Sequence, residues 1–232
     1  MITKDMTLAN VVKDYPQTIG FLNRLHLDYC CGGHDPIAIA VAEKGLDVEQ
    51  FLEDLNRAAS RPVSSGKDTH ADVEAFRKRS IPAMLDDLEA THHVKDRTLM
   101  RQVEDDLNKI LIVHYPHHGK MLTELHSRYA KLKAALEEHF AREERYVFPL
   151  MRDTMPPTGT ARAEVQALIE EHTAAGDQIK AIQALTENFK LPSDACPTFR
   201  LTYQTFQDLF DDIFVHIFKE NSIAFPAYLE LR

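Results

Sequence analysis

Apolar residues beyond about residue 80 recur at alternating steps of three and four, which is the spacing of the buried face of a helix. Three stripes of this kind are clear, over residues 122–150, 165–182 and 206–223. The first stripe is expected to keep Tyr146 and Leu150 on its buried face. Breaks that contain proline fall near Tyr115–Pro116, residues 155–159 and residues 191–194. Such short connections make neighbouring helices antiparallel, so the pattern predicts a four-helix bundle over residues 79–232.

The first 60 residues contain shorter helical segments with recognisable starts. Thr7 and Asp47 are suitable N-cap residues, and Gln50 completes a predicted capping box three residues after Asp47. Residues 61–78 begin with a stretch rich in Ser, Gly and Lys and are predicted to be a linker. The fold is therefore predicted to be all-α, with a small helical domain over residues 1–60, a linker and then the bundle.

Five polar residues stand where the apolar stripes of the bundle require Leu or Ile. They are His139, Glu143, His172, His216 and Glu220. Two of the histidines are each followed by a glutamate four residues later, a spacing that puts both side chains on one helix face. A single inward histidine is commonly a hydrogen-bonded core residue, but two buried carboxylates need a compensating positive charge. The set therefore predicts a bound metal.

The first bundle helix should contribute a ligand at the same level, because antiparallel positions meet when they are equally far from the connecting turn. That level falls near residue 92, where the chain has His92 and His93. The apolar residues before this pair favour an inward His92, whereas those after it favour His93. His114 lies about 31 Å further along the helix and is expected to lie outside the site. Periodicity alone leaves His92 and His93 as alternatives.

The predicted donor set is four histidines and two glutamates, without a thiolate. Such a set suits iron, manganese or zinc, and carboxylates on facing helices can bridge two ions. Glu171, beside His172, could support a metal ligand but is expected to be a solvated helix residue. Cys196 is expected to be structural. The histidines expected on the surface are His117, His118 and His126.

Composition narrows the class of protein. The 27 Lys and Arg residues against 36 Asp and Glu residues give a formal charge of −9, which disfavours nucleic-acid binding. No apolar run has the length of a membrane span, and no signal peptide is expected at the N-terminus. Three cysteines do not make a disulfide framework. We therefore expect a cytoplasmic protein with reduced thiols that binds neither nucleic acid nor a membrane.

Cys30 and Cys31 are adjacent and are followed by two glycines. Glycines let the backbone turn tightly, so both thiols are expected to be accessible. The pair suits a relay for a metal ion or nitric oxide, or a redox couple, and the alternative is two small buried residues. The residues alone leave both interpretations open.

Taken in their order along the chain, the cysteine segment and the histidine and glutamate motifs of the bundle resemble the Repair of Iron Centers family. The resemblance covers nearly the whole chain. Residues 28–33 are similar to the N-terminal ScdA-type signature of that family, and residues 139–149 and 216–226 are similar to its two hemerythrin-like ligand motifs. His172 and His93 fall where the family has its other ligands, so the resemblance selects the second histidine of the 92–93 pair. Residues 113–119 depart from the family pattern.

The resemblance implies a non-haem di-iron centre, with Glu143 and Glu220 bridging two iron ions. It also implies a role in repairing iron–sulfur clusters damaged by nitrosative or oxidative stress, through iron donation, nitric oxide removal or both. Cys30 and Cys31 would then act as a mobile catalytic relay. The implied partners are damaged iron–sulfur proteins and nitric oxide or another small diatomic ligand, and homodimerisation is left open.

Two other functions share the same predicted metal site. A hemerythrin-like module would carry or sense oxygen or nitric oxide without turnover. A di-iron oxidoreductase would reduce nitric oxide to nitrous oxide. Reversible binding has no need of a thiol-bearing domain, which favours cluster repair, and enzymatic activity toward nitric oxide stays an open alternative.

Overall fold

The computed structural model describes residues 1–30, 33, 35–60 and 69–232. Over these residues the secondary structure is helical, apart from one isolated antiparallel bridge between Thr7 and Pro36. The predicted all-α class is therefore confirmed. None of the described helices is both long and apolar enough to cross a lipid bilayer. The chain divides into two compact units, which are residues 1–87 with 214–232, and residues 88–213.

The first unit consists mainly of short helices. They are α1 (Leu8–Asp14), α2 (Ile19–Arg24), α3 (Ile37–Glu43), α4 (Val48–Ala59), α5 (Thr69–Arg77), α6 (Ile81–Leu88) and α11 (Phe225–Leu229). The predicted caps are present, because the Thr7 side chain accepts from the Asn10 backbone at 3.2 Å and Asp47 accepts from Gln50 at 2.7 Å. The Gln50 side chain donates to Asp54 instead of reaching back to Asp47, so only half of the predicted capping box forms.

Part of the predicted linker is a helix. Residues 69–77, inside the 61–78 segment, form α5, on which Val73 and Phe76 are fully buried. Lys219 lies over the Phe76 ring, with Nζ 5.0 Å from its centroid, and pairs with Asp72 at 2.7 Å. Two apolar residues three positions apart give this stretch a buried helical face. The linker prediction is wrong here because it relies on the polar composition at the start of the segment. Residues 61–68 lie outside the described part of the chain.

The loop that contains the cysteine pair is anchored by an aromatic residue. Tyr29 is fully buried, and its ring meets Phe214 and Phe218 edge-on, with both centroids 6.1 Å away. Gly33 is required here, because a Cβ atom at this position would lie 2.7 Å from the Tyr29 carbonyl group.

Cys30 is buried, with 3% of its surface exposed, so the expectation that its thiol is accessible is wrong in this conformation. The Asp28 side chain accepts hydrogen bonds from the Cys30 backbone at 3.0 Å and from its thiol at 3.5 Å. This turn draws the thiol toward the chain instead of leaving it in solvent. Cys31 lies outside the described residues.

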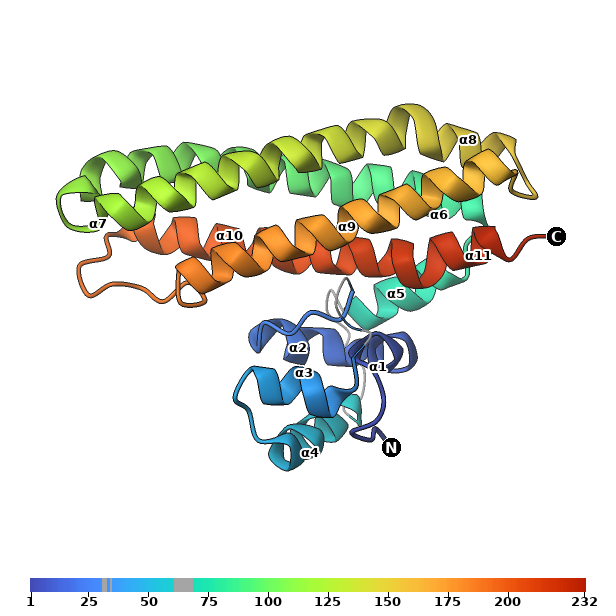
Figure 1. The fold of residues 1–232 in the computed structure, drawn as a ribbon, viewed down its shortest axis with the longest axis horizontal. Helices are drawn as coiled ribbons and strands as arrows, with labels where there is room; N and C mark the ends of the chain where they lie inside the picture. Colours follow the sequence, from blue (N-terminus) through green and yellow to red (C-terminus); the bar gives the residue numbers. More distant parts are fainter. Residues whose placement is uncertain (31–32, 34, 61–68) are drawn as a thin grey trace. The chain divides into compact units, whose positions relative to one another are not determined.

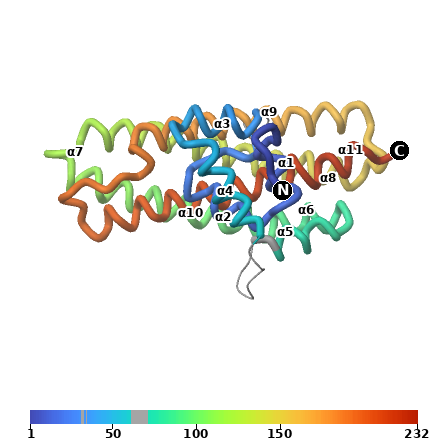
Figure 2. Tube along the Cα trace, turned by 90° about the horizontal axis from the view of Figure 1, so that it is seen from below, coloured from blue at the N-terminus to red at the C-terminus, as the bar shows by residue number. Residues whose placement is uncertain are grey.

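The second unit is built from long helices, which run along a common direction in Figures 1 and 2. They are α7 (Val94–Arg142), α9 (Gly159–Leu185) and α10 (Pro197–Lys219), with the short α8 (Phe148–Asp153) after α7. Residues 214–219 of α10 belong to the first unit.

Helix α7 supplies two arms of the bundle. It is helical throughout and contains Pro116, yet its halves lie side by side and antiparallel (Figure 1). Tyr129 donates to the Met100 carbonyl at 2.6 Å, and Lys133 pairs with Glu104 at 2.5 Å. The reversal falls where the sequence predicts a break between the first two helices.

In the part of the chain that the structure describes, three π-helical turns interrupt the α-helices. They are η2 (Glu89–His93), η3 (Glu143–Val147) and η4 (Glu220–Ala224). A π turn takes up one residue more than an α turn and so rotates everything that follows it. Tyr146, expected on the buried face, is 48% exposed and Leu150 is half-buried, whereas Val147 and Met151 are fully buried. That expectation is wrong because η3 shifts the register by one residue.

Candidate metal centre

The six predicted ligands are buried and come from every arm of the bundle. They are His93 in η2, His139 in α7, Glu143 in η3, His172 in α9, His216 in α10 and Glu220 in η4. Each π turn therefore contains one of them at its end or its beginning. The extra residue of a π turn changes the rotation of the helix, and so changes the direction in which this side chain points.

Glu143 faces two histidines with its two oxygens. Its Oε2 atom lies 3.3 Å from His93 Nε2, and its Oε1 atom lies 3.3 Å from His139 Nε2. His172 Nε2 lies 2.9 Å from His139 Nε2. On the last helix, His216 Nε2 lies 3.3 Å from Glu220 Oε1. The two oxygens of Glu143 thus point to different histidines, as a bridging carboxylate requires.

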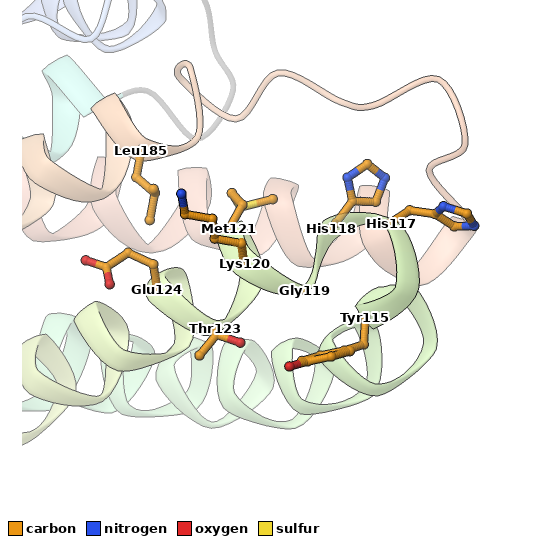
Figure 3. A pocket seen from close by; sticks show the side chains of 9 residues that line it. All are labelled: Tyr115, His117, His118, Gly119, Lys120, Met121, Thr123, Glu124 and Leu185. Carbon is orange, nitrogen blue, oxygen red and sulfur yellow. The ribbon is translucent and has the colours of Figure 1, made fainter.

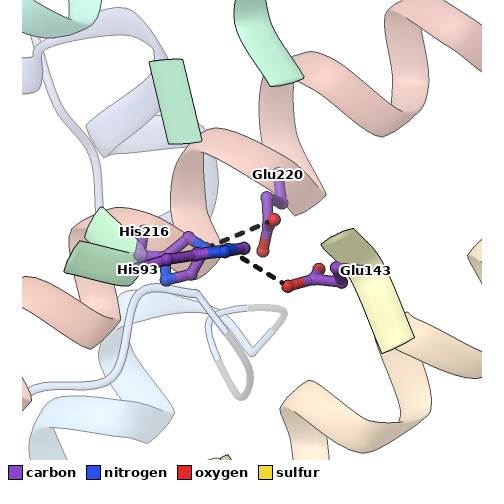
Figure 4. Close-up of side chains that lie close together, drawn as sticks. All are labelled: His93, Glu143, His216 and Glu220. Atoms are coloured by element: carbon purple, nitrogen blue, oxygen red, sulfur yellow. Dashed lines mark ion pairs between the residues drawn. The ribbon is translucent and has the colours of Figure 1, made fainter. Parts of the chain in front are cut away.

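The ligand atoms form two groups of four, and within each group all atoms lie within 4.8 Å of one another. One group is His93, Glu143, His216 and Glu220, and the other is His139, Glu143, His172 and Glu220. Figure 4 shows the first group, in which the imidazoles of His93 and His216 approach the carboxylates of Glu143 and Glu220. Both glutamates belong to both groups, so the cluster suits a pair of ions that share two carboxylates.

The distances fit metal coordination. Two ligand atoms that lie about 2.1 Å from one ion and about 90–110° apart are about 3.0–3.4 Å from each other. The separations of 2.9 Å and 3.3 Å between facing ligand atoms lie close to that range. Glu143 and Glu220 are fully buried, and two buried carboxylate charges are costly in free energy unless a cation compensates them.

A carboxylate holds the outer nitrogen of two ligand histidines. His93 donates from Nδ1 to Glu144 at 2.9 Å, and His139 donates from Nδ1 to Glu171 at 2.7 Å. A neutral imidazole that donates from Nδ1 presents a lone pair at Nε2, the atom that faces the cluster. Both rings are therefore fixed in the tautomer that binds a metal.

Each of these carboxylates is held in turn by an arginine. Arg97 donates to Glu144 at 2.6 Å, and Arg142 pairs with Glu171. Burial raises the pKa of Glu144, but Arg97 and His93 outweigh it and hold that pKa below its usual value. The hydrogen bond from His139, together with the charge and hydrogen bond of Arg142, lowers the pKa of Glu171 in spite of its partial burial. Both carboxylates stay ionised and orient their histidines.

The expectation that Glu171 is a solvated residue is wrong. Its side chain is 38% exposed, but its carboxylate is committed to His139 and Arg142. Glu144 was missed for the same reason, because both acids are polar residues at the edge of an apolar stripe. The signal in the sequence is adjacency: Glu144 directly follows the predicted ligand Glu143, and Glu171 directly precedes the predicted ligand His172.

Aromatic rings shield the centre on the His93 side. The imidazole of His93 stacks on Phe140 with 4.7 Å between centroids, and on Phe148 with 6.0 Å. Both phenylalanines are buried. A dry, low-dielectric wall of this kind strengthens the electrostatic interactions inside the site.

The structure brings His93, and not His92, to the ligand cluster. His92 donates from Nδ1 to Asp212 at 2.9 Å, and Lys95 pairs with the other oxygen of Asp212 at 2.6 Å. Burial raises the pKa of Asp212, but His92 and Lys95 together hold it well below its usual value. The η2 turn explains the conflicting periodicities before and after the pair, because it adds one residue between the two apolar stripes.

Three other histidines of α7 lie outside the ligand cluster. His114 is buried beside Cys196, His118 pairs with Asp194 and His126 lies beside Asn108, all outside the two ligand groups. His118 is partly exposed, and the reversal of α7 places it against the segment before α10.

Comparison with known proteins agrees with this architecture. Residues 83–228 match the model of the hemerythrin HHE cation binding domain, and residues 4–59 match ScdA_N, a domain of unknown function. The chain is 25% identical to the iron-sulfur cluster repair protein ScdA of Staphylococcus haemolyticus, over 98% of this chain and all of that protein. It is 28% identical to the iron-sulfur cluster repair proteins YtfE of Shigella boydii and Escherichia coli O157:H7, over 99% of each chain.

The match to the hemerythrin domain, over residues 83–228, includes all six of the buried histidines and glutamates predicted to be ligands. The resemblance found in the sequence is therefore confirmed. The chain belongs to the hemerythrin HHE cation-binding family, with a ScdA_N segment ahead of the family's bundle.

Proposed function

We propose that this protein holds two iron ions in the bundle and takes part in the repair of damaged iron–sulfur clusters. The observation that carries the proposal is the sharing of Glu143 and Glu220 by two four-ligand groups. The relatives named as iron–sulfur cluster repair proteins support the cellular role, because they align with nearly the whole chain.

The ligands divide evenly between two ions. His93 and His216 would bind one ion and His139 and His172 the other, while the two glutamates bridge them. Four protein ligands per ion leave open positions on a metal that prefers six. Bound iron would supply one-electron redox chemistry and a binding position for a small diatomic molecule such as nitric oxide.

The protein's own groups prepare the centre for that chemistry. Glu144 and Glu171 orient one histidine of each ion, and Arg97 and Arg142 keep the two carboxylates ionised and in place. Because each ion has its own outer carboxylate, its affinity can be changed separately. This property makes the two-ion assignment testable.

Cys30 and Cys31 are proposed to act in repair and not in holding the bundle iron. The bundle offers a complete ligand set without sulfur. Cys30 lies directly after Tyr29, which packs against Phe214 and Phe218 on either side of the ligand His216. Because Cys30 is buried, its thiol would act only when the turn formed by Asp28 opens.

Carriage of oxygen or nitric oxide and reduction of nitric oxide to nitrous oxide are the competing functions. The ScdA_N segment favours repair, since a reversible carrier has no need of a second domain. Reactivation of a damaged cluster enzyme separates the three: a carrier gives none, and a reductase yields nitrous oxide without restoring the client's iron.

The test combines metal analysis with a repair assay. Purified protein should contain two iron ions per chain, with the Mössbauer spectrum of a coupled pair, and should reactivate an iron–sulfur enzyme inactivated by nitric oxide. The Glu143→Gln, Glu220→Gln double variant should lose both properties, whereas Glu138→Gln, at an exposed position of the same helix, should keep them. One iron per chain, or full iron in the double variant, would overturn the proposal.

A further inference from the structure

A second set of metal-binding side chains gathers at the reversal of α7. His114 and His118 are one helical turn apart on α7, and Asp194 and Cys196 lie directly before α10. His114 Nε2 lies 3.2 Å from Cys196 Sγ, and His118 Nε2 lies 2.9 Å from Asp194 Oδ1. Both contacts join positions more than 70 residues apart, so the fold brings the four side chains together.

The two histidines share one aromatic neighbour. Phe199 is fully buried and meets the His114 and His118 rings edge-on, with centroids 5.1 Å and 6.0 Å away. The two imidazole centroids are 6.2 Å apart. Phe199 thus holds both rings on the side of α7 that faces the start of α10.

Within each pair, the two facing atoms have a separation close to that of two ligands on one ion. For tetrahedral zinc, a nitrogen and a sulfur ligand are about 3.5 Å apart, and a nitrogen and an oxygen ligand are about 3.3 Å apart. The distances of 3.2 Å and 2.9 Å fall a few tenths of an ångström below these values. Imidazole, thiolate and carboxylate are also the side chains that zinc selects.

The four groups stand as two pairs and not as one closed shell, because among the described residues no three of their ligand atoms come within 4.8 Å of one another. The pair that has to move is the exposed one, with side chains 24% exposed at His118 and 47% at Asp194. His118 also lines an open pocket of about 780 Å³ with Tyr115, His117 and Lys120, which leaves it room to turn (Figure 3).

We propose that His114, His118, Asp194 and Cys196 form a second metal site for one thiophilic divalent cation of the zinc type. His114 and Cys196 provide the buried half of the site, and His118 and Asp194 close it from the exposed side. A cation there would tie the reversal of α7 to the beginning of α10. The site is about 31 Å along α7 from His93, so it is independent of the iron-binding cluster.

The experiment uses the full-length, iron-loaded protein and Co²⁺ as a visible substitute for zinc. Anaerobic titration should produce a thiolate-to-cobalt charge-transfer band in the near ultraviolet that saturates at one cobalt per chain. Zn²⁺ added afterwards should remove the band. The bundle cluster has no thiolate, so it cannot give this signal.

The key variant is Cys196→Ser, which removes the sulfur but preserves the local fold. Cys196 Sγ accepts a hydrogen bond from the Phe199 backbone at 3.4 Å, and a serine hydroxyl caps a helix in the same way. Cys196→Ser should abolish the band, and His114→Gln should weaken cobalt binding by about tenfold or more. Iron content should be unchanged in both variants.

Two controls isolate the site. His117→Gln changes an exposed neighbour of the same helical turn, and the Cys30→Ser, Cys31→Ser double variant removes the other adjacent thiols. Both should bind cobalt with the band intact. A wild-type protein without the band, a band that survives Cys196→Ser, or a band lost in the Cys30→Ser, Cys31→Ser variant would overturn the proposal.

Discussion

Replacing Glu171 by glutamine should weaken the binding of one of the two proposed metal ions and leave the binding of the other unchanged. Glu171 accepts the Nδ1–H of His139, and His139 belongs to only one of the two ligand groups. Glutamine keeps an oxygen that can accept this hydrogen bond but loses the negative charge that increases the basicity of the imidazole. The ion bound by His139 and His172 should therefore dissociate first.

The magnitude follows from the type and exposure of the interaction. A hydrogen bond to an ionised partner contributes about 1.5–3 kcal/mol when it is well shielded. Glu171 is 38% exposed, so solvent screening reduces the effect of its charge. We expect a loss of about 1–2 kcal/mol, which corresponds to roughly 5- to 30-fold weaker binding of that ion.

Chelator competition measures this difference directly. Iron-loaded wild-type and Glu171→Gln proteins are titrated with a chromogenic ferrous chelator, and the number of ions removed is followed together with the Mössbauer spectrum. The variant should release one ion at a lower chelator concentration than wild type and pass through a form with a single iron. Wild type should release both ions at higher concentrations.

Two variants make the result specific. Glu144→Gln changes the carboxylate that accepts from His93 Nδ1, and it should weaken the binding of the other ion to a similar extent. Glu170→Gln changes an exposed neighbour and should behave as wild type. If Glu171→Gln matches Glu170→Gln, or if both ions weaken equally, the assignment of His139 to one ion and His93 to the other is refuted.

Three further predictions concern other parts of the chain. His93→Gln should lower iron content, whereas His92→Gln should leave it near wild type because His92 faces Asp212; metal analysis of both variants decides this. The Cys30→Ser, Cys31→Ser variant should keep its iron but lose client reactivation in the repair assay. Asp212→Asn should be less stable than wild type at pH 7, and the difference should shrink as the pH falls below about 4, because the folded state lowers the pKa of Asp212 and its contribution is lost on protonation; urea unfolding over that pH range measures it.

Each of these predictions has an outcome that contradicts it. Equal iron loss from the His92 and His93 variants would mean that η2 does not discriminate between the two rings. Iron loss in the double cysteine variant would make the thiols ligands, and unimpaired reactivation would remove their role in repair. A stability difference for Asp212→Asn that persists unchanged at pH 3 would show that its charge is not the origin.

The helical class and the level of the predicted ligand cluster follow from the amino-acid sequence alone. His139, Glu143, His216 and Glu220 could be identified because a polar residue on an apolar stripe is conspicuous, and i,i+4 spacing is a property of any α-helix. The level of the partner on the first helix also follows from chain length, since the rise per residue is constant. Local geometry was enough for these inferences.

Packing of the helices selects which ring of the 92–93 pair turns inward and which carboxylates support the predicted ligands. No local preference in the sequence marks a π turn, so η2 and η3 rotate the helices in a way that a regular period cannot anticipate. The same rotation exposes Tyr146 and buries Val147.

The periodicity of apolar residues also does not predict contacts between segments that are far apart in the sequence. The pairing of Glu171 with His139, the burial of Cys30 and the meeting of His114 with Cys196 depend on how side chains are placed after the helices have packed. Periodicity reports which face of a helix is buried, because burial is averaged over many apolar contacts. A single hydrogen bond depends on the position of two atoms to within a few tenths of an ångström, and only the packed structure sets that position.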